Sequence, residues 1–270
     1  MAKIRLDILL HNRGLAASRE KARAFILAGE VKVNGLMVDK PGSSIAEDAD
    51  IEVISSAPKY VSRGGLKLEK AISDFQVDFA GRTVLDVGAS TGGYTDCALK
   101  HGALKVYALD VGYGQLDWKL RNDPRVVTLE RINIRYFSIQ ELGQTVDIIT
   151  VDVSFISTAL VFPVLKNLLD EDGTVISLIK PQFEVGKDKV GKKGVVREAE
   201  LHRQVLLNCI AYAQKEGLFC IGVTYSPITG PQGNIEYFIQ LKKTAQPLEK
   251  LEEMAAQVVA EAHRQLGGKK

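Results

Sequence analysis

The segment VLDVGASTGGYT, at residues 84–95, joins a short apolar run to a glycine-rich loop. The run predicts a buried β-strand, and the residues that follow the loop have a helical pattern. Glycines at such a junction let the backbone approach a ligand closely, and the amino end of a helix favours negative charge. The segment therefore predicts a nucleotide-binding turn at the end of a central strand.

The glycine spacing narrows the choice of nucleotide. A dinucleotide-binding turn has the pattern GxGxxG, whereas here Gly88 is followed two positions later by Ser90, and the next glycines are Gly92 and Gly93. With Asp86 in front, the spacing instead resembles the first motif of S-adenosylmethionine-dependent methyltransferases. A different nucleotide and a purely structural turn are the alternatives, and Asp86 could then merely cap a helix.

Two further residues fit the same pocket. The second strand-like run ends at Asp110, 22 residues after Gly88, where an acid is placed to bind both hydroxyls of a ribose. Asn133 comes just after the third run and either contacts an adenine or serves as a turn residue. We therefore predict S-adenosylmethionine as the cofactor, bound by Asp86, Gly88, Ser90, Gly92, Gly93, Asp110, Asn133 and Asp152.

The chain from residue 83 onwards alternates between strand-like and helix-like patterns. The strand-like runs are 83–87, 105–110, 125–129, 147–152, 174–180, 218–225 and 235–241. This alternation predicts an α/β fold with a mostly parallel, Rossmann-like sheet and helices on both faces. The last two runs are joined by a Gly/Pro-rich loop without room for a helix, which predicts antiparallel pairing and an antiparallel edge strand. An amphipathic helix is expected after residue 247.

A smaller unit precedes this sheet. Residues 4–54 contain two short helical patterns, the hairpin signal Asn34-Gly35 and a closing strand at 51–54. Residues 55–58 read as a linker. We expect a small α+β domain at 1–58 and a catalytic domain at 59–270.

Basic residues cluster although the net charge of the 270 residues is only +2. Residues 1–40 carry eight Lys and Arg against four Asp and Glu, and residues 180–197 carry six against two. Such local excess favours a polyanionic partner, although an ordinary solvated face is the alternative. The candidate RNA contacts are Arg5, Arg13, Arg19, Lys21, Arg23, Lys32, Arg63, Lys187, Lys189, Lys192 and Lys193.

Other classes of protein are disfavoured. The cysteines at 97, 209 and 220 form no CxxC pair, so that neither a zinc site nor a disulfide framework is expected. No run approaches 18 apolar residues, and the first residues do not resemble a signal peptide. We expect a reduced, cytoplasmic protein that binds no membrane and no metal.

The end of the fourth strand-like run indicates which kind of atom accepts the methyl group. Methyltransferases acting on exocyclic base nitrogens usually present Asn-Pro-Pro-aromatic at this point, whereas this chain has Asp152-Val-Ser-Phe155. Enzymes acting on pyrimidine carbon 5 need a cysteine nucleophile near this edge, and none of the three cysteines is placed there. An oxygen acceptor remains.

Four charged residues are expected to converge on that acceptor. Asp152 and Lys180 end adjacent parallel strands, Glu236 begins the final antiparallel strand, and Lys67 belongs to a basic helical segment before the sheet. A ribose 2′-hydroxyl needs a base as its methyl group arrives, and a lysine close to a second cation can serve. Taken singly, Lys67 could be a phosphate contact and Glu236 an ordinary edge charge.

The motifs together resemble a known family. SRGGLKLEKA (62–71), VLDVGASTGGYT, VDVSFIS, IKPQFEVGK, KGVVRE and GNIEYF are similar to the TlyA family of ribosomal RNA 2′-O-methyltransferases, with an FtsJ/RrmJ-type catalytic domain. The resemblance implies a catalytic tetrad of Lys67, Asp152, Lys180 and Glu236, and an RNA-binding domain in 1–58 like that of ribosomal protein S-four. It also implies methylation of cytidine in ribosomal RNA of one or both subunits. Some members of the family are labelled hemolysins.

Three other functions are alternatives to this interpretation of the sequence. One is a non-catalytic RNA-binding or ribosome assembly factor, and another is a membrane-active hemolysin. The third is an RNA-modifying enzyme of another class, because pseudouridine synthases carry a similar small domain.

Overall fold

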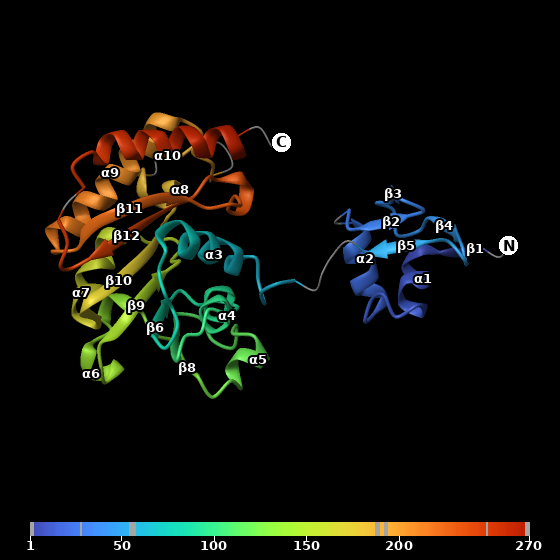
Figure 1. Cartoon of the computed structure of the whole chain (residues 1–270), viewed down its shortest axis with the longest axis horizontal. Helices are drawn as coiled ribbons and strands as arrows, with labels where there is room; N and C mark the ends of the chain where they lie inside the picture. The colour runs from blue at the N-terminus through green and yellow to red at the C-terminus, as the bar shows by residue number, and fades with distance from the viewer. Residues whose placement is uncertain are drawn as a thin grey trace. The chain divides into compact units, whose positions relative to one another are not determined.

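The computed structural model describes residues 3–27, 29–53, 58–186, 190–191, 194–246 and 248–267. The chain divides into two compact units, Met1–Lys59 and Tyr60–Lys270 (Figure 1). Each unit has hydrophobic clusters of its own. No helix in the described ranges is both long and apolar enough to cross a membrane.

The small unit packs two helices against short strands. Its elements are β1 (Lys3–Arg5), α1 (Leu6–Asn12), α2 (Arg19–Leu27), β2 (Val31–Val33), β3 (Leu36–Met37), β4 (Ser44–Ala46) and β5 (Ile51–Val53). Asn34 and Gly35 both have positive φ, at 50° and 79°, and turn β2 into β3 as the sequence predicts. The strand β5 then pairs with β2.

The first residues depart from the expected helical pattern. Ile4 lies in β1, which pairs antiparallel with β4, and α1 begins only at Leu6. Arg5 has an extended backbone, because its segment is bonded to a neighbouring strand. A strand of three residues is too short for periodicity to reveal.

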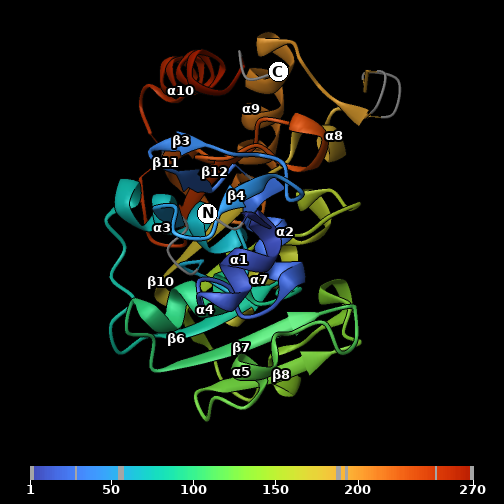
Figure 2. The same cartoon turned by 90° about the vertical axis from the view of Figure 1, so that its right-hand side faces the viewer.

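The large unit is built on one seven-stranded sheet in the order β11-β12-β10-β9-β6-β7-β8. The strands are β6 (Thr83–Val87), β7 (Lys105–Asp110), β8 (Val126–Glu130), β9 (Val146–Val151), β10 (Leu169–Ile179), β11 (Phe219–Tyr225) and β12 (Tyr237–Lys242). The neighbours from β10 to β8 are parallel, whereas β12 is antiparallel to both β10 and β11. The mostly parallel sheet is therefore confirmed, with the antiparallel strand lying one position inside the edge. Figure 2 shows β6, β7 and β8 side by side.

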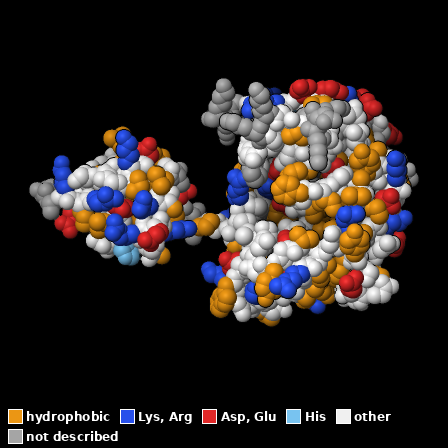
Figure 3. Space-filling model, turned by 180° about the vertical axis from the view of Figure 1, so that it is seen from behind, with side chains coloured by type: hydrophobic (Ala, Val, Ile, Leu, Met, Phe, Trp, Pro, Cys, Tyr) orange, Lys and Arg blue, Asp and Glu red, His pale blue; other side chains and the backbone are white. Residues whose placement is uncertain are grey.

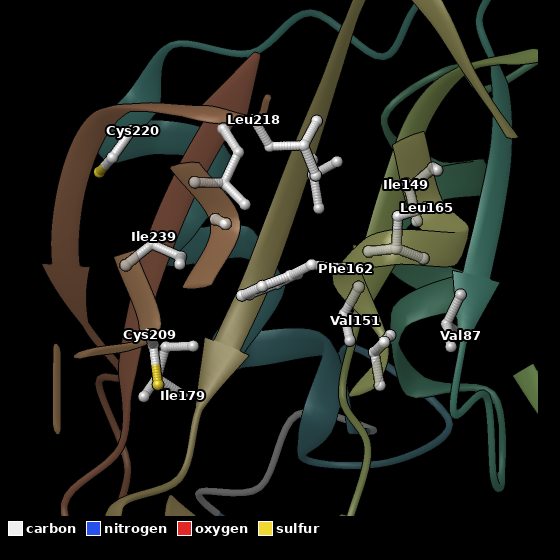
Figure 4. Packing of buried hydrophobic residues seen from close by; sticks show 14 of the residues in the cluster. Val87, Ile149, Val151, Phe162, Leu165, Ile179, Cys209, Leu218, Cys220 and Ile239 are labelled. Atoms are coloured by element: carbon white, nitrogen blue, oxygen red, sulfur yellow. The ribbon is translucent and has the colours of Figure 1, made fainter. Parts of the chain in front are cut away.

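Helices cover both faces of this sheet. Successive strand residues point to opposite sides, and apolar residues on both sides have to be covered. Leu85 and Val87 pack on one face with side chains of α6, α7, α9 and α10, part of which Figure 4 shows. Val84 packs on the other face with side chains of α3, α4 and α5. The helices are α3 (Gly64–Phe75), α4 (Gly93–Lys100), α5 (Trp118–Arg121), α6 (Ile139–Leu142), α7 (Phe162–Leu168), α8 (Pro181–Glu184), α9 (Ala199–Lys215) and α10 (Leu251–Leu266), with short 3-10 turns η1 (Ile134–Tyr136), η2 (Thr158–Leu160) and η5 (Pro231–Gly233).

The strand ends come together at one edge of the sheet. In the paired register, Ile179 of β10 lies opposite Tyr237, the first residue of β12. Val87 of β6 lies beside Val151 of β9 and beside Leu109 of β7. The residues that immediately follow β6, β7, β9 and β10, and the residue before β12, therefore share this edge.

Candidate active site

The glycine turn that follows β6 packs closely against the backbone that follows β9 and against the end of β7. Gly88 has a φ of +88°, and a Cβ atom on it would lie 2.5 Å from the carbonyl oxygen of Asp152. Its N–H donates to the carbonyl of Leu109 at 2.8 Å. Gly92, with φ +95°, immediately precedes α4. Side chains at these two positions would be strained or would clash, which explains the glycines of the motif.

A cavity of about 700 Å³ opens beside this turn, over the carboxyl ends of β6, β7 and β9. Asp110 lines it, and its two carboxylate oxygens accept the N–H groups of Ser90 at 2.8 Å and Gly112 at 2.7 Å. A carboxylate has about four acceptor positions, so two remain for a ligand's hydroxyls. Asn133 also lines the cavity, and its Oδ1 caps η1 by accepting the N–H of Arg135 at 3.1 Å.

Asp86 does not reach this cavity. It is fully buried beneath the turn, where its carboxylate accepts the hydroxyls of Thr95 at 2.7 Å and Thr150 at 3.0 Å. Burial raises the pKa of Asp86 to about 7. The structure therefore places this residue as a link from α4 to β6 and β9, and not in contact with a cofactor as the motif predicts.

A second cavity, of about 300 Å³, adjoins the first, and the two share Gly88, Ser90, Asp152 and Ser154. The second cavity is lined by all four residues of the expected tetrad. Lys180 lies with its Nζ atom 2.6 Å from Oδ1 of Asp152, and Lys67 lies with its Nζ atom 2.5 Å from Oε2 of Glu236. Only 9% of Lys180 and 6% of Lys67 is exposed. The structure thus forms a buried ion pair, Lys67–Glu236, in the smaller cavity, and a partly buried pair, Lys180–Asp152, where the two cavities meet.

The local chain explains how these groups are held. Lys180 is the residue before Pro181, which begins α8 and ends the run of β10. Glu236 is wholly buried, and its Oε1 atom has no hydrogen-bond partner among the described residues. A Cβ atom on Gly230 would lie 2.2 Å from that oxygen, so only glycine leaves room for the carboxylate.

Two side chains at this site were not predicted. Ser154 accepts a hydrogen bond from Nζ of Lys180 at 2.9 Å, so two of the three ammonium hydrogens are engaged. Tyr94 lines the same cavity, and its buried hydroxyl has no partner within the described ranges. Burial raises the pKa of this hydroxyl well above its usual value. Both residues lie inside the quoted motifs VDVSFIS and GGYT, which is the only signal the sequence offers.

Several predicted RNA contacts in the small unit have partners within it. Arg5 and Arg19 both bond to the buried Asp7, at 2.9 and 3.3 Å, and the Arg5 bond lowers the pKa of Asp7. Arg13 donates to backbone carbonyls, and Lys32 pairs with an exposed carboxylate. The three arginines therefore also hold the unit together, whereas the exposed pair of Lys32 contributes little stability.

The other basic candidates differ in their surroundings. Lys21 lies 5.3 Å from the ring centre of Phe25, and Arg23 is exposed. Arg63 lines the smaller cavity beside Lys67. The predicted loop contacts Lys187, Lys189, Lys192 and Lys193 lie outside the described residues.

Comparison with known proteins identifies both units. Residues 60–243 match the family model "FtsJ-like methyltransferase", and residues 4–51 match the "S4 domain". The chain is 48% identical to "Putative rRNA methyltransferase YqxC" of Bacillus subtilis, over 99% of this chain and 97% of that protein. It is 45% identical to "16S/23S rRNA (cytidine-2'-O)-methyltransferase TlyA" of Mycobacterium tuberculosis, over 89% and 90% of the two chains.

A solved structure agrees over the whole length. "Putative hemolysin from Streptococcus thermophilus" is 41% identical, covers 99% of this chain and 98% of its own, and superposes with a TM-score of 0.77. The chain therefore belongs to the FtsJ-like family of S-adenosylmethionine-dependent methyltransferases and carries an S4 domain in residues 4–51.

Proposed function

We propose that this enzyme methylates the 2′-oxygen of a cytidine ribose in ribosomal RNA, in the cytoplasm. The observation that carries the proposal is the Lys180–Asp152 ion pair at the junction of the two cavities. Asp152 lines both cavities, so an acceptor held by Lys180 lies next to the bound cofactor. The names of the relatives from Bacillus and Mycobacterium support the choice of ribosomal RNA, and that of the Mycobacterium protein supports cytidine.

The residues of the larger cavity fit S-adenosylmethionine. Asp110 has acceptor positions free for the ribose hydroxyls, and Asn133 lines the same cavity, where its side chain can meet the adenine. Gly88 lets the turn pack directly against the backbone of Asp152, which borders this cavity. Bound there, the cofactor supplies a methyl group activated by its positive sulfonium. Its positive charge is favoured by Asp152 at the mouth of the smaller cavity.

The smaller cavity prepares the acceptor hydroxyl. In this proposal Lys180 first releases one ammonium proton to solvent and then receives the proton of the 2′-hydroxyl as the methyl group bonds to the oxygen, while Asp152 and Ser154 hold its Nζ atom in position. Lys67 and Glu236 present a second ion pair to the same space, beside the acceptor hydroxyl. The buried setting strengthens each of these interactions.

The S4 domain is proposed to supply RNA affinity. Lys and Arg side chains lie exposed on its surface (Figure 3). They would meet phosphates, and binding of this kind weakens with salt. Because the small unit has its own hydrophobic cluster, deleting residues 1–58 should leave cofactor binding near normal and abolish methylation of ribosomal substrate.

The test is a methyl-transfer assay on separated ribosomal subunits, with the modified nucleotide mapped by mass spectrometry. We expect a 2′-O-methylated cytidine in at least one subunit, and none with the Lys180→Ala variant. Methylation on a base would contradict the tetrad assignment. Tight binding to subunits without any transfer would instead indicate an assembly factor.

A further inference from the structure

Large aromatic side chains stand exposed at the β7 and β8 side of the cofactor cavity. Tyr113 follows β7 and is 68% exposed, and Tyr136 ends η1 after β8 and is 74% exposed. Both segments leave the carboxyl edge of the sheet, where the active site lies. Exposed rings grouped beside a functional cavity indicate a binding surface.

Each ring is accompanied by an arginine. The guanidinium carbon of Arg131 lies 4.2 Å from the ring centre of Tyr113, and that of Arg135 lies 5.4 Å from the ring centre of Tyr136. Both arginines are exposed, and neither forms an ion pair with a carboxylate in the described part of the chain. The nearby Glu130 is already paired with Arg121. Each exposed ring therefore has beside it an exposed arginine that forms no ion pair among the described residues.

The backbone holds this arrangement in place. Arg131 has a φ of +59°, a conformation that residues other than glycine rarely adopt. Its N–H donates to the carbonyl of Gly112 at 3.0 Å, which ties the end of β8 to the loop carrying Tyr113. An unfavourable backbone conformation that is kept by surrounding bonds is common at functional positions.

We propose that Tyr113, Arg131, Arg135 and Tyr136 form a docking surface for unpaired nucleotides that flank the target nucleotide. Aromatic rings and guanidinium planes stack on bases, and arginine also meets phosphate, so the combination suits single-stranded RNA. Arg135 lines the cofactor cavity as well, which makes the surface continuous with the active site. The proposal rests on the proposed function and adds a contact region on the methyltransferase unit to that of the S4 domain.

The test measures RNA affinity of the full-length protein for three variants, Tyr113→Ala, Arg131→Ala and Tyr136→Ala. Arg125→Ala is the matched control, because Arg125 lies at the opposite end of β8 and pairs with Asp123. The probes are purified ribosomal subunits and the same ribosomal RNA stripped of protein. Dissociation constants are measured over a range of salt, and the rate of methyl transfer is measured at saturating RNA.

We expect each of the three variants to weaken binding to both probes about tenfold, which lies within the range for losing one stacked base. Arg131→Ala should also reduce the slope of log affinity against log salt by about 0.7, the value for one phosphate contact with a single strand. The rate at saturating RNA and the cofactor affinity should stay unchanged, and Arg125→Ala should behave as wild type.

Unchanged affinities for both probes would overturn the proposal. Weaker binding to subunits alone would also overturn it, because the partner would then be a ribosomal protein. Failure of the wild type to methylate either subunit would count against the proposed function, while the binding measurements would still decide whether this surface contacts RNA.

Discussion

Replacing Lys67 by methionine should strongly destabilise the methyltransferase unit. Nζ of Lys67 lies 2.5 Å from Oε2 of Glu236, and the two side chains are only 7% and 0% exposed. The other oxygen of Glu236 already has no partner in the described structure. The variant would therefore leave a buried carboxylate without any compensating group, a change that typically costs about 3–5 kcal/mol of stability.

A second substitution should reverse most of this loss. In the double variant Lys67→Met with Glu236→Leu, two apolar side chains of similar size replace the buried pair. Such replacements are often neutral, or stabilising by about 1–4 kcal/mol, because neither charge has to be removed from water. Both variants should nevertheless be inactive. Restored stability without activity would show that the ion pair is kept for chemistry and reduces stability.

Amide hydrogen exchange, followed on peptides from α3 and β12, gives the free energy of unfolding of each of these segments separately. The control is Arg203→Ala, which removes the partly exposed pair with Glu200 on α9 and should change stability by less than about 1 kcal/mol. If the double variant is as unstable as Lys67→Met alone, the pair contributes net stability and the reasoning is wrong.

Three further outcomes are expected. Lys180→Arg should keep cofactor affinity but lower the rate of methyl transfer at least about 100-fold, because arginine cannot release its proton; a near wild-type rate at saturating RNA would exclude Lys180 as the base. Asp110→Ala should weaken S-adenosylmethionine binding at least about tenfold by calorimetry, since a charged hydrogen-bonding group is lost. The pKa of Asp86 is raised from 3.8 to about 7, so the folded state holds its proton more tightly, and this group should lower stability by up to about 4 kcal/mol as pH rises from 4 to 7. Urea unfolding at several pH values should show that Asp86→Asn removes this loss, and an unchanged pH dependence would contradict the assignment.

Sequence patterns located the sheet and the convergence of the four charged residues for a simple physical reason. Residues that follow parallel strands share one edge, and an antiparallel strand begins at that edge, so Lys180 and Glu236 could be placed together before their contacts were known. Lys67 was harder to place, because nothing in a helical pattern states which strand the helix packs on. Its position depends on α3 covering the same face as α4.

The sequence patterns did not predict the direction in which the Asp86 side chain points or the order of the strands in the sheet. Motif spacing put Asp86 beside the cofactor, although alternation along β6 places it on the same face as the buried Val84, under α4. The position of β12 between β10 and β11 is a matter of strand order, which the hydrophobic pattern does not record. The engagement of Ser154 with Lys180 depends on the path of a loop, for which no periodicity exists.

The place of β12 also has a consequence for how the molecule is made. Both neighbours of this strand, β10 and β11, are synthesised before it, so each must keep a free edge until the last strand enters the gap between them. Glu236 immediately precedes β12 and is the last of the four charged residues to emerge. A chain that ends before this strand therefore lacks both the closed sheet and the fourth charged residue of the active site.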